Sequence, residues 1–158
     1  MANAWITALL WFSAVGCGVM AGVYFAFSGF IMTALARIEA PSGVAAMSSI
    51  NVVISRSLFL PLFFATAIAA LVRFVVGLLR WGSPGARALV VGGALYVVGM
   101  FAVTMTRNVP LNNALQAAAS SSAGAAEVWA RYLREWTLWN HVRTVASTAA
   151  CALFIAAR

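Results

Sequence analysis

Four apolar segments limit what this chain of 158 residues can fold into. A helix needs about 20 apolar residues to cross the hydrocarbon core of a bilayer. Segments that reach or nearly reach this length cover residues 4–35, 57–79, 88–105 and 139–157. Because lipid offers the backbone no hydrogen bonds, such segments are helical. The sequence therefore predicts an all-α fold: a single domain, residues 1–158, forming an integral, multi-pass four-helix bundle of the cell membrane.

Composition supports a membrane protein and argues against several other classes. Hydrophobic residues make up 64% of the chain and charged residues 8%. All the basic residues are arginines, and they are scattered at the predicted membrane boundaries. We therefore expect the lipid bilayer as a partner and no nucleic acid. With one histidine and no paired-cysteine motif, we expect no metal and no cofactor.

The first segment contains a helix-packing motif. Gly18 and Gly22 have GxxxG spacing, which allows the backbone of a neighbouring helix to approach closely. That neighbour is either another helix of the bundle or a second copy of the chain in a homo-oligomer.

Between the first two segments, residues 41–56 are predicted to form a short helix at the membrane interface. One face of this helix is apolar and includes Val44, Met47 and Ile54, with Leu58 continuing the line. Asn51 lies in the middle of that face. A polar amide in an apolar stripe needs a partner, so Asn51 either bonds to another helix or lines a site.

The second half of the chain is expected to contain a break and a long last helix. Pro110 should end the third helix or begin a new short one. Residues 117–124 are small and read as a linker, and helical periodicity resumes at about Ala125. At about 1.5 Å per residue the last helix is about 50 Å long, so it extends beyond the bilayer.

Aromatic and polar residues gather on one face of that last helix. On a helix, six residues fall within an arc of about 80°: Trp129, Tyr132, Trp136, Asn140, Arg143 and Ser147. A guanidinium on this face would be costly if it faced lipid, so the face is expected to point inward. His141 points about 100° away from it.

The end of the first segment contributes a second aromatic surface around Tyr24. It is predicted to lie on the same membrane side as Asn51, Asn108 and Arg143. An aromatic-walled pocket with amides and a guanidinium at its rim would suit a flat, oxygen-bearing apolar ligand, such as an aromatic or quinone-like small molecule.

Several motifs together resemble a known family of small membrane proteins. These motifs are Gly22-Val-Tyr-Phe-Ala-Phe-Ser28, Asn51, Asn108-Val-Pro-Leu-Asn112, Trp136 and Trp139-Asn140-His141-Val-Arg143. In order and spacing over nearly the whole chain they resemble the proteins grouped with fungal anthrone oxygenases. The resemblance implies a four-helix membrane fold and an oxygenase that converts a benzylic CH₂ into a carbonyl with dioxygen and without a conventional cofactor.

The resemblance also implies roles for individual residues. His141 would be the base, and Arg143 would stabilise a phenolate or enolate. Oxygen atoms or a peroxide would be held by Asn108, Asn112 and Asn140. The ring system of the substrate would be bound by Tyr24, Asn51, Tyr132, Trp136 and Trp139.

A competing interpretation has no enzymatic activity. In it the chain is a membrane bundle that binds a lipid, a quinone or a partner membrane protein. Asn108, Asn140 and Arg143 then join helix ends and have no chemical role. A pocket too small for a tricyclic ligand would favour this alternative.

Overall fold

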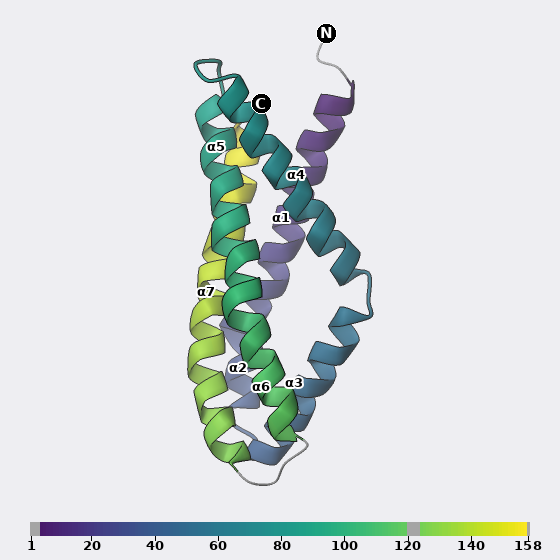
Figure 1. Ribbon diagram of the computed structural model, residues 1–158, viewed down its shortest axis with the longest axis vertical. Coiled ribbons are helices and arrows are strands. Elements are labelled where there is room, and N and C mark those ends of the chain that lie inside the picture. Colours follow the sequence, from purple (N-terminus) through teal and green to yellow (C-terminus); the bar gives the residue numbers. More distant parts are fainter. Residues whose placement is uncertain (1–3, 120–123, 158) are drawn as a thin grey trace.

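The computed structural model describes residues 4–119 and 124–157, and this part of the chain forms five helices (Figure 1). The first combines α1 (Ala4–Ala26), η1 (Phe27–Ile31) and α2 (Met32–Leu35), where η marks a π-helical turn. The second and third are α3 (Ala40–Ser55) and α4 (Phe59–Leu79). The fourth combines α5 (Ala86–Ala94), η2 (Leu95–Ala102), η3 (Thr104–Asn108) and α6 (Val109–Ala119). The fifth is α7 (Ala125–Ala156). The predicted all-α class is confirmed.

Three of the described helices are long and apolar enough to cross a membrane: Thr7–Leu35, Phe59–Leu79 and Ala86–Ala119. They overlap the first three predicted segments, and the third helix extends beyond its segment. α7 is not in this group, because polar residues interrupt the apolar run after Trp139.

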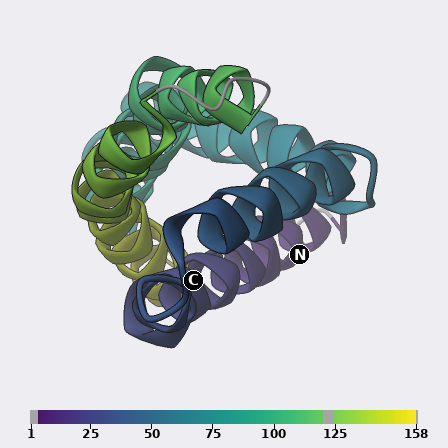
Figure 2. The same cartoon turned by 90° about the horizontal axis from the view of Figure 1, so that it is seen from below.

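The helices run along one long axis, with α7 as the central element. α7 contacts α1, α3, α5 and α6 as well as the π-helical turns. The turn between α4 and α5 lies at the same end as the C-terminal end of α7, and the connection from α2 to α3 lies at the opposite end (Figure 1). α3 and α4 meet at a corner on the side away from α7. Figure 2 shows, from below, α1, α7, α6 and the α3–α4 pair surrounding a common centre.

Two clusters of buried side chains fill the interior. One, around Met20, Phe63 and Tyr96, lies toward the end that holds the α4–α5 turn. The other lies toward the opposite end and is built on the aromatic face of α7. There Tyr132 stacks between Trp129 and Trp136, with ring centroids 5.8 and 5.6 Å apart. All six residues of the predicted inward face are buried. This confirms that the face points into the bundle.

The fourth helix differs from its prediction. The third segment was expected to end near Met105, with a break at Pro110, but the helix continues from Ala86 to Ala119. Pro110 is the second residue of α6, and α6 directly follows the π-helical turn η3. Proline is tolerated in the first turn of a helical segment, where its missing N–H is not needed. The helix is thus not broken at Pro110, whereas the alternative that Pro110 begins a new short helix agrees with α6, an 11-residue segment that starts at Val109.

The two other connecting segments are partly as predicted. α3 matches the short helix expected over residues 41–56, and it rises obliquely along the bundle and does not lie across its end (Figure 1). Val44 and Met47 are buried, whereas Leu58 lies beyond the helix and is exposed. Of the predicted linker, residues 117–119 belong to α6; residues 120–123 lie outside the described part.

The GxxxG motif gives close contact within this chain at one glycine only. A Cβ added at Gly18 would lie 3.5 Å from Cys151 Sγ, whereas one added at Gly22 would meet nothing within 4 Å. The alternative that the motif joins two copies of the chain stays a prediction.

Replacing Gly43 with valine should loosen the packing of α3 against α7. A Cβ at Gly43 would lie 2.6 Å from Cζ2 of Trp129, so the ring or the helix must move. Overpacking of this kind costs about 1–3 kcal/mol, and we expect a lower midpoint of thermal unfolding in detergent. Gly22→Val is the matched control, because Gly22 borders open space. Equal midpoints for the two variants would contradict the contact with Trp129.

Candidate functional site

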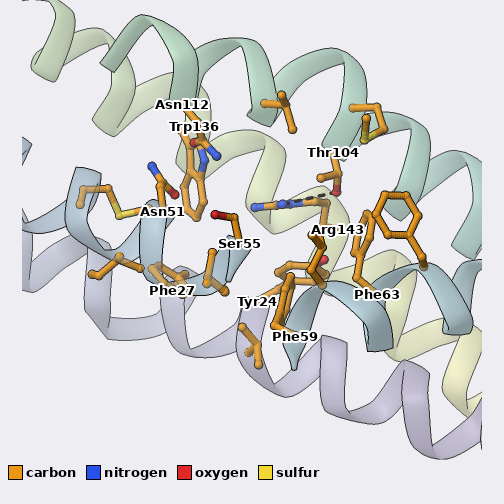
Figure 3. A pocket seen from close by; sticks show the side chains of 18 residues that line it. Tyr24, Phe27, Asn51, Ser55, Phe59, Phe63, Thr104, Asn112, Trp136 and Arg143 are labelled. Carbon is orange, nitrogen blue, oxygen red and sulfur yellow. Dashed lines mark hydrogen bonds between the residues drawn. The ribbon is translucent and has the colours of Figure 1, made fainter. Parts of the chain in front are cut away.

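A cavity of about 250 Å³ lies between the α3–α4 corner and α1, η3, α6 and α7 (Figure 3). Its aromatic walls are Tyr24, Phe27, Phe59, Phe63, Phe64 and Trp136. Its polar side chains are Asn51, Ser55, Thr104, Asn112 and Arg143. An engineered apolar cavity of about 150 Å³ in another protein holds benzene, so this cavity has room for a ligand with fused rings.

Arg143 is the charged group of this cavity. α7 places it on the buried face, and 5% of the residue is exposed. Its guanidinium donates to Asn140 Oδ1 at 2.7 Å and to Thr104 Oγ1 at 3.4 Å. The guanidinium carbon also lies 4.4 Å from the centre of the Tyr24 ring and 5.0 Å from that of the Trp136 ring. These cation–π contacts offset part of the lost hydration.

No carboxylate balances the charge of Arg143 among the described residues. The cavity lining contains no acidic residue. The one ion pair among the described residues joins Arg131 to Glu135 on the exposed surface. The hydrogen bond from Arg131 lowers the pKa of Glu135. Nε of Arg143 is buried and has no hydrogen-bond partner in the described chain. Because burying an unpaired cation costs several kcal/mol, the cavity favours an anionic or electron-rich oxygen.

Asn140 joins Arg143 to the first helix. Its Nδ2 donates to the Tyr24 carbonyl oxygen and to Ser28 Oγ, both at 2.7 Å, while its Oδ1 accepts from Arg143. Tyr24 and Ser28 flank the start of the π-helical turn η1, an irregularity that is frequent at functional sites. Asn140 is fully buried and does not line the cavity. Its hydrogen bonds hold the guanidinium against the first helix, and the contact with oxygen or peroxide that the resemblance implies for Asn140 stays a prediction.

A second polar group lies at the other side of the cavity, where Figure 3 shows Asn51, Asn112 and Trp136 close together. Tyr132 donates its hydroxyl to Asn112 Oδ1 at 2.7 Å and is itself buried behind the wall. Asn51 lies beside the same hydroxyl. Asn51 Nδ2 and Trp136 Nε1 are buried without a hydrogen-bond partner in the described residues. Of the residues expected to bind the rings, Tyr24, Asn51 and Trp136 line the cavity, and Tyr132 supports it from outside.

Three predicted site residues lie away from the cavity. His141 is exposed and is not part of the lining. Trp139 is half-buried and lies under Arg107, whose guanidinium carbon is 4.8 Å from the ring centre. Asn108 is buried and donates through Nδ2 to the Trp136 carbonyl oxygen at 3.2 Å. The structure thus brings Arg143, Asn112, Tyr24, Asn51 and Trp136 together, and the roles implied for His141, Trp139 and Asn108 stay predictions.

Sequence reasoning missed the contribution of the second and third apolar segments. Phe59 and Phe63 line the cavity from α4, and Thr104 reaches Arg143 from η3. The two phenylalanines have i, i+4 spacing and so share a helix face. That spacing was the available signal, but it is also ordinary for core packing.

The edge of the cavity is apolar. Leu60, Phe64 and Met105 belong to the lining and are also exposed. Leu60 and Phe64 come from α4 and Met105 from η3, two helices that are long and apolar enough to cross a membrane. The cavity therefore reaches the outer surface between these two helices.

The donor set of the cavity fits an organic ligand better than a cation. The described residues contain no group of three His, Cys, Asp or Glu side chains that could hold a metal ion. The polar lining consists of amides, hydroxyls and a guanidinium, and a guanidinium repels a cation. Oxygen atoms of an organic molecule match these donors.

The fold and the cavity define an all-α protein with three helices that could cross a membrane and with an aromatic pocket around a buried arginine. The chain belongs to the anthrone oxygenase family, which it matches over residues 50–153. The predicted membership is confirmed, although the matched region does not include the motif from Gly22 to Ser28. No curated protein and no solved structure matches the chain.

Proposed function

We propose that this protein is a membrane oxygenase that acts on polycyclic phenolic or quinone-like compounds without a cofactor. The observation that supports the proposal is Arg143, a buried guanidinium with no counterion in the described chain and with an aromatic cavity in front of it. Family membership supplies the reaction class. Because a shared family does not fix an activity, the proposal rests on the cavity and needs a direct test.

The proposed reaction converts a benzylic CH₂ into a carbonyl, with one dioxygen consumed and one water released. Loss of a proton from the CH₂ gives an enolate, whose negative oxygen Arg143 stabilises. The electron-rich carbon then reacts with dioxygen. Tyr24 and Trp136 pack against the rings, while Asn51 and Asn112 bind further oxygen atoms. Asn140 and Tyr132 keep Arg143 and Asn112 in place.

The proposal includes a fourth membrane span within α7, in a multi-pass protein of the cell membrane. The polar residues that lower the hydropathy of this helix, among them Asn140, Arg143 and Ser147, are buried. Its exposed side chains include Leu138, Val142, Val145 and Ile155, which suit lipid. His141 and Thr148 are exposed beside them, so the support for the four-span bundle is the burial of Asn140, Arg143 and Ser147 away from the surface of α7.

Oxygen uptake by the purified, detergent-solubilised protein with emodin anthrone tests the proposal. We expect uptake and anthraquinone formation above the rate of boiled protein, which measures spontaneous autoxidation. An uptake rate equal to that background, from protein shown to be folded, would reject an oxygenase acting on this class of compound.

A second candidate function is binding without turnover, of a quinone or a lipid. One observation favours it: the cavity lining contains neither a histidine nor a carboxylate that could act as a base. In this case the protein would bind a hydroxyanthraquinone and consume no dioxygen. Binding and uptake measured on the same preparation distinguish the two functions.

His141→Ala should retain turnover to within about twofold. The side chain is exposed and is not part of the cavity lining, whereas a general base must come within hydrogen-bonding reach of the proton that it removes. Oxygen uptake with emodin anthrone, measured against the unaltered protein, checks this result. A loss of turnover in folded His141→Ala would restore the role of His141 as the base.

A further inference from the structure

Among the side chains that line the cavity, the buried polar atoms that lack a partner in the described residues are all donors. They are Arg143 Nε, Trp136 Nε1 and Asn51 Nδ2, each without a hydrogen-bond partner in the described residues. Trp136 is 4% exposed and Arg143 is 5% exposed. Buried donors of this kind are normally paired. All three residues belong to the lining of the same cavity, so a bound ligand is the natural partner.

Two of the acceptors that belong to the lining are already used by the protein. Asn112 Oδ1 accepts from Tyr132, and Thr104 Oγ1 accepts from Arg143 and itself donates to the Met100 carbonyl oxygen. A ligand hydroxyl that must donate a hydrogen bond therefore finds few free acceptors here. A ligand that presents only acceptors finds three donors.

We infer that the cavity binds its ligand as the conjugate base, and that Arg143 lowers the pKa of the bound ligand enough to remove the need for a side-chain base. The inference rests on the proposed function for the identity of the ligand, a polycyclic phenol or enol. The acidic proton leaves the ligand for water, and the negative oxygen that remains is bound by the guanidinium. The O–H bond of the phenol or enol breaks in this step. No bond to carbon is made or broken, and no electron is transferred.

The charged and titratable groups around the ligand support this interpretation. Among the lining residues, α7 contributes Arg143 and α1 contributes Tyr24, whose hydroxyl donates to Met100 Sδ at 3.4 Å. α3, α4, η3 and α6 contribute no acidic, basic or histidine side chain to the lining. The net field of these side chains on the ligand is therefore that of one cation. An opposite charge within a few ångströms favours the ionised form of an acid.

Alizarin, a hydroxyanthraquinone whose colour reports its ionisation, tests the inference without any turnover. The measurement is a spectrophotometric pH titration of alizarin bound to the detergent-solubilised protein, compared with alizarin in protein-free micelles. We expect the apparent pKa of bound alizarin to fall by about one to three pH units. Arg143→Met should abolish the shift and Arg143→Lys should keep most of it. An unchanged pKa in the unaltered protein, or a full shift in folded Arg143→Met, would overturn the inference.

Two further measurements keep the test decisive. Trp136→Phe retains an aromatic ring but loses the Nε1 donor, so it should reduce the pKa shift of bound alizarin. This variant tests the inference even if Arg143→Met does not fold. An undiminished shift would show that Trp136 Nε1 does not bind the ionised ligand. Dimethoxyanthraquinone accepts hydrogen bonds but cannot ionise, so Arg143→Met should weaken its binding much less than it weakens the binding of ionised alizarin; an equal loss for both ligands would overturn the inference. A shift of alizarin without oxygen uptake would reject the proposed oxygenase and keep this inference. Uptake without a shift would do the reverse.

Discussion

Arg143→Met should lower the rate of oxygen uptake with emodin anthrone by about two orders of magnitude or more. A donor aimed at a developing oxyanion is worth about 10²–10³ in rate, and Arg143 is the cation in the lining of this cavity. Methionine has a similar length and is apolar, so it fills the space. Because the guanidinium is buried without a counterion in the described chain, its removal also relieves a desolvation cost. We therefore expect a folded but inactive protein.

Two other arginine variants show whether charge or position matters. Arg134 lies on the same helix and is exposed, so Arg134→Met should leave oxygen uptake unchanged. Arg143→Lys keeps a positive charge but loses the planar fork that contacts Asn140 and Thr104, so an intermediate rate is expected. Full activity in Arg143→Met, or an equal loss in Arg134→Met, would show that Arg143 has no special place in the reaction.

The part of the site that lies on one helix could be predicted from the sequence. Helical geometry is local, so a rotation of about 100° per residue is enough to place Trp136, Asn140 and Arg143 on one face and His141 off it. The structure has Trp136, Asn140 and Arg143 buried and His141 exposed. The inference that a guanidinium on this face points inward followed from the cost of placing it in lipid.

The contacts between helices could not be predicted in the same way. Which residues of α4 and η3 face Arg143 depends on how the helices rotate and cross, and no single-helix pattern contains that information. Thr104, Phe59 and Phe63 were therefore missed. Asn140 is a similar case: the helix pattern placed it near Arg143, but it could not predict the bonds of Asn140 to Tyr24 and Ser28.

The backbone irregularities were also beyond sequence reasoning. A proline in a helix interior normally breaks the helix, yet Ala86–Ala119 runs through Pro110, which lies in the first turn of α6 after η3. π-helical turns have no simple sequence signature, although they often mark functional sites. Here η1 carries Ser28, a partner of Asn140, and η3 carries Thr104, a partner of Arg143.

Asn140→Leu should destabilise the protein by about 1.5–3 kcal/mol, the range for a hydrogen bond to a charged group. Asn140 Oδ1 is the acceptor of the shorter of the two hydrogen bonds of Arg143, at 2.7 Å. Leucine has nearly the same size but neither accepts that bond nor donates to the Tyr24 carbonyl oxygen. The guanidinium then remains buried, and its hydrogen bond to Thr104 at 3.4 Å is the longer of its two. The measurement is the free energy of unfolding in mixed micelles of a mild detergent and SDS.

Asn113→Leu is the matched control, since Asn113 is exposed on α6 and surface substitutions usually change stability by about 0.5 kcal/mol or less. The double variant Asn140→Leu/Arg143→Met separates the two contributions to the cost. If most of it comes from the unpaired guanidinium, removing that charge should recover much of the lost stability, because the two substitutions are then strongly non-additive. Additive effects would instead show that Asn140 stabilises the protein through the first helix, by its bonds to Tyr24 and Ser28, and that Arg143 does not depend on it.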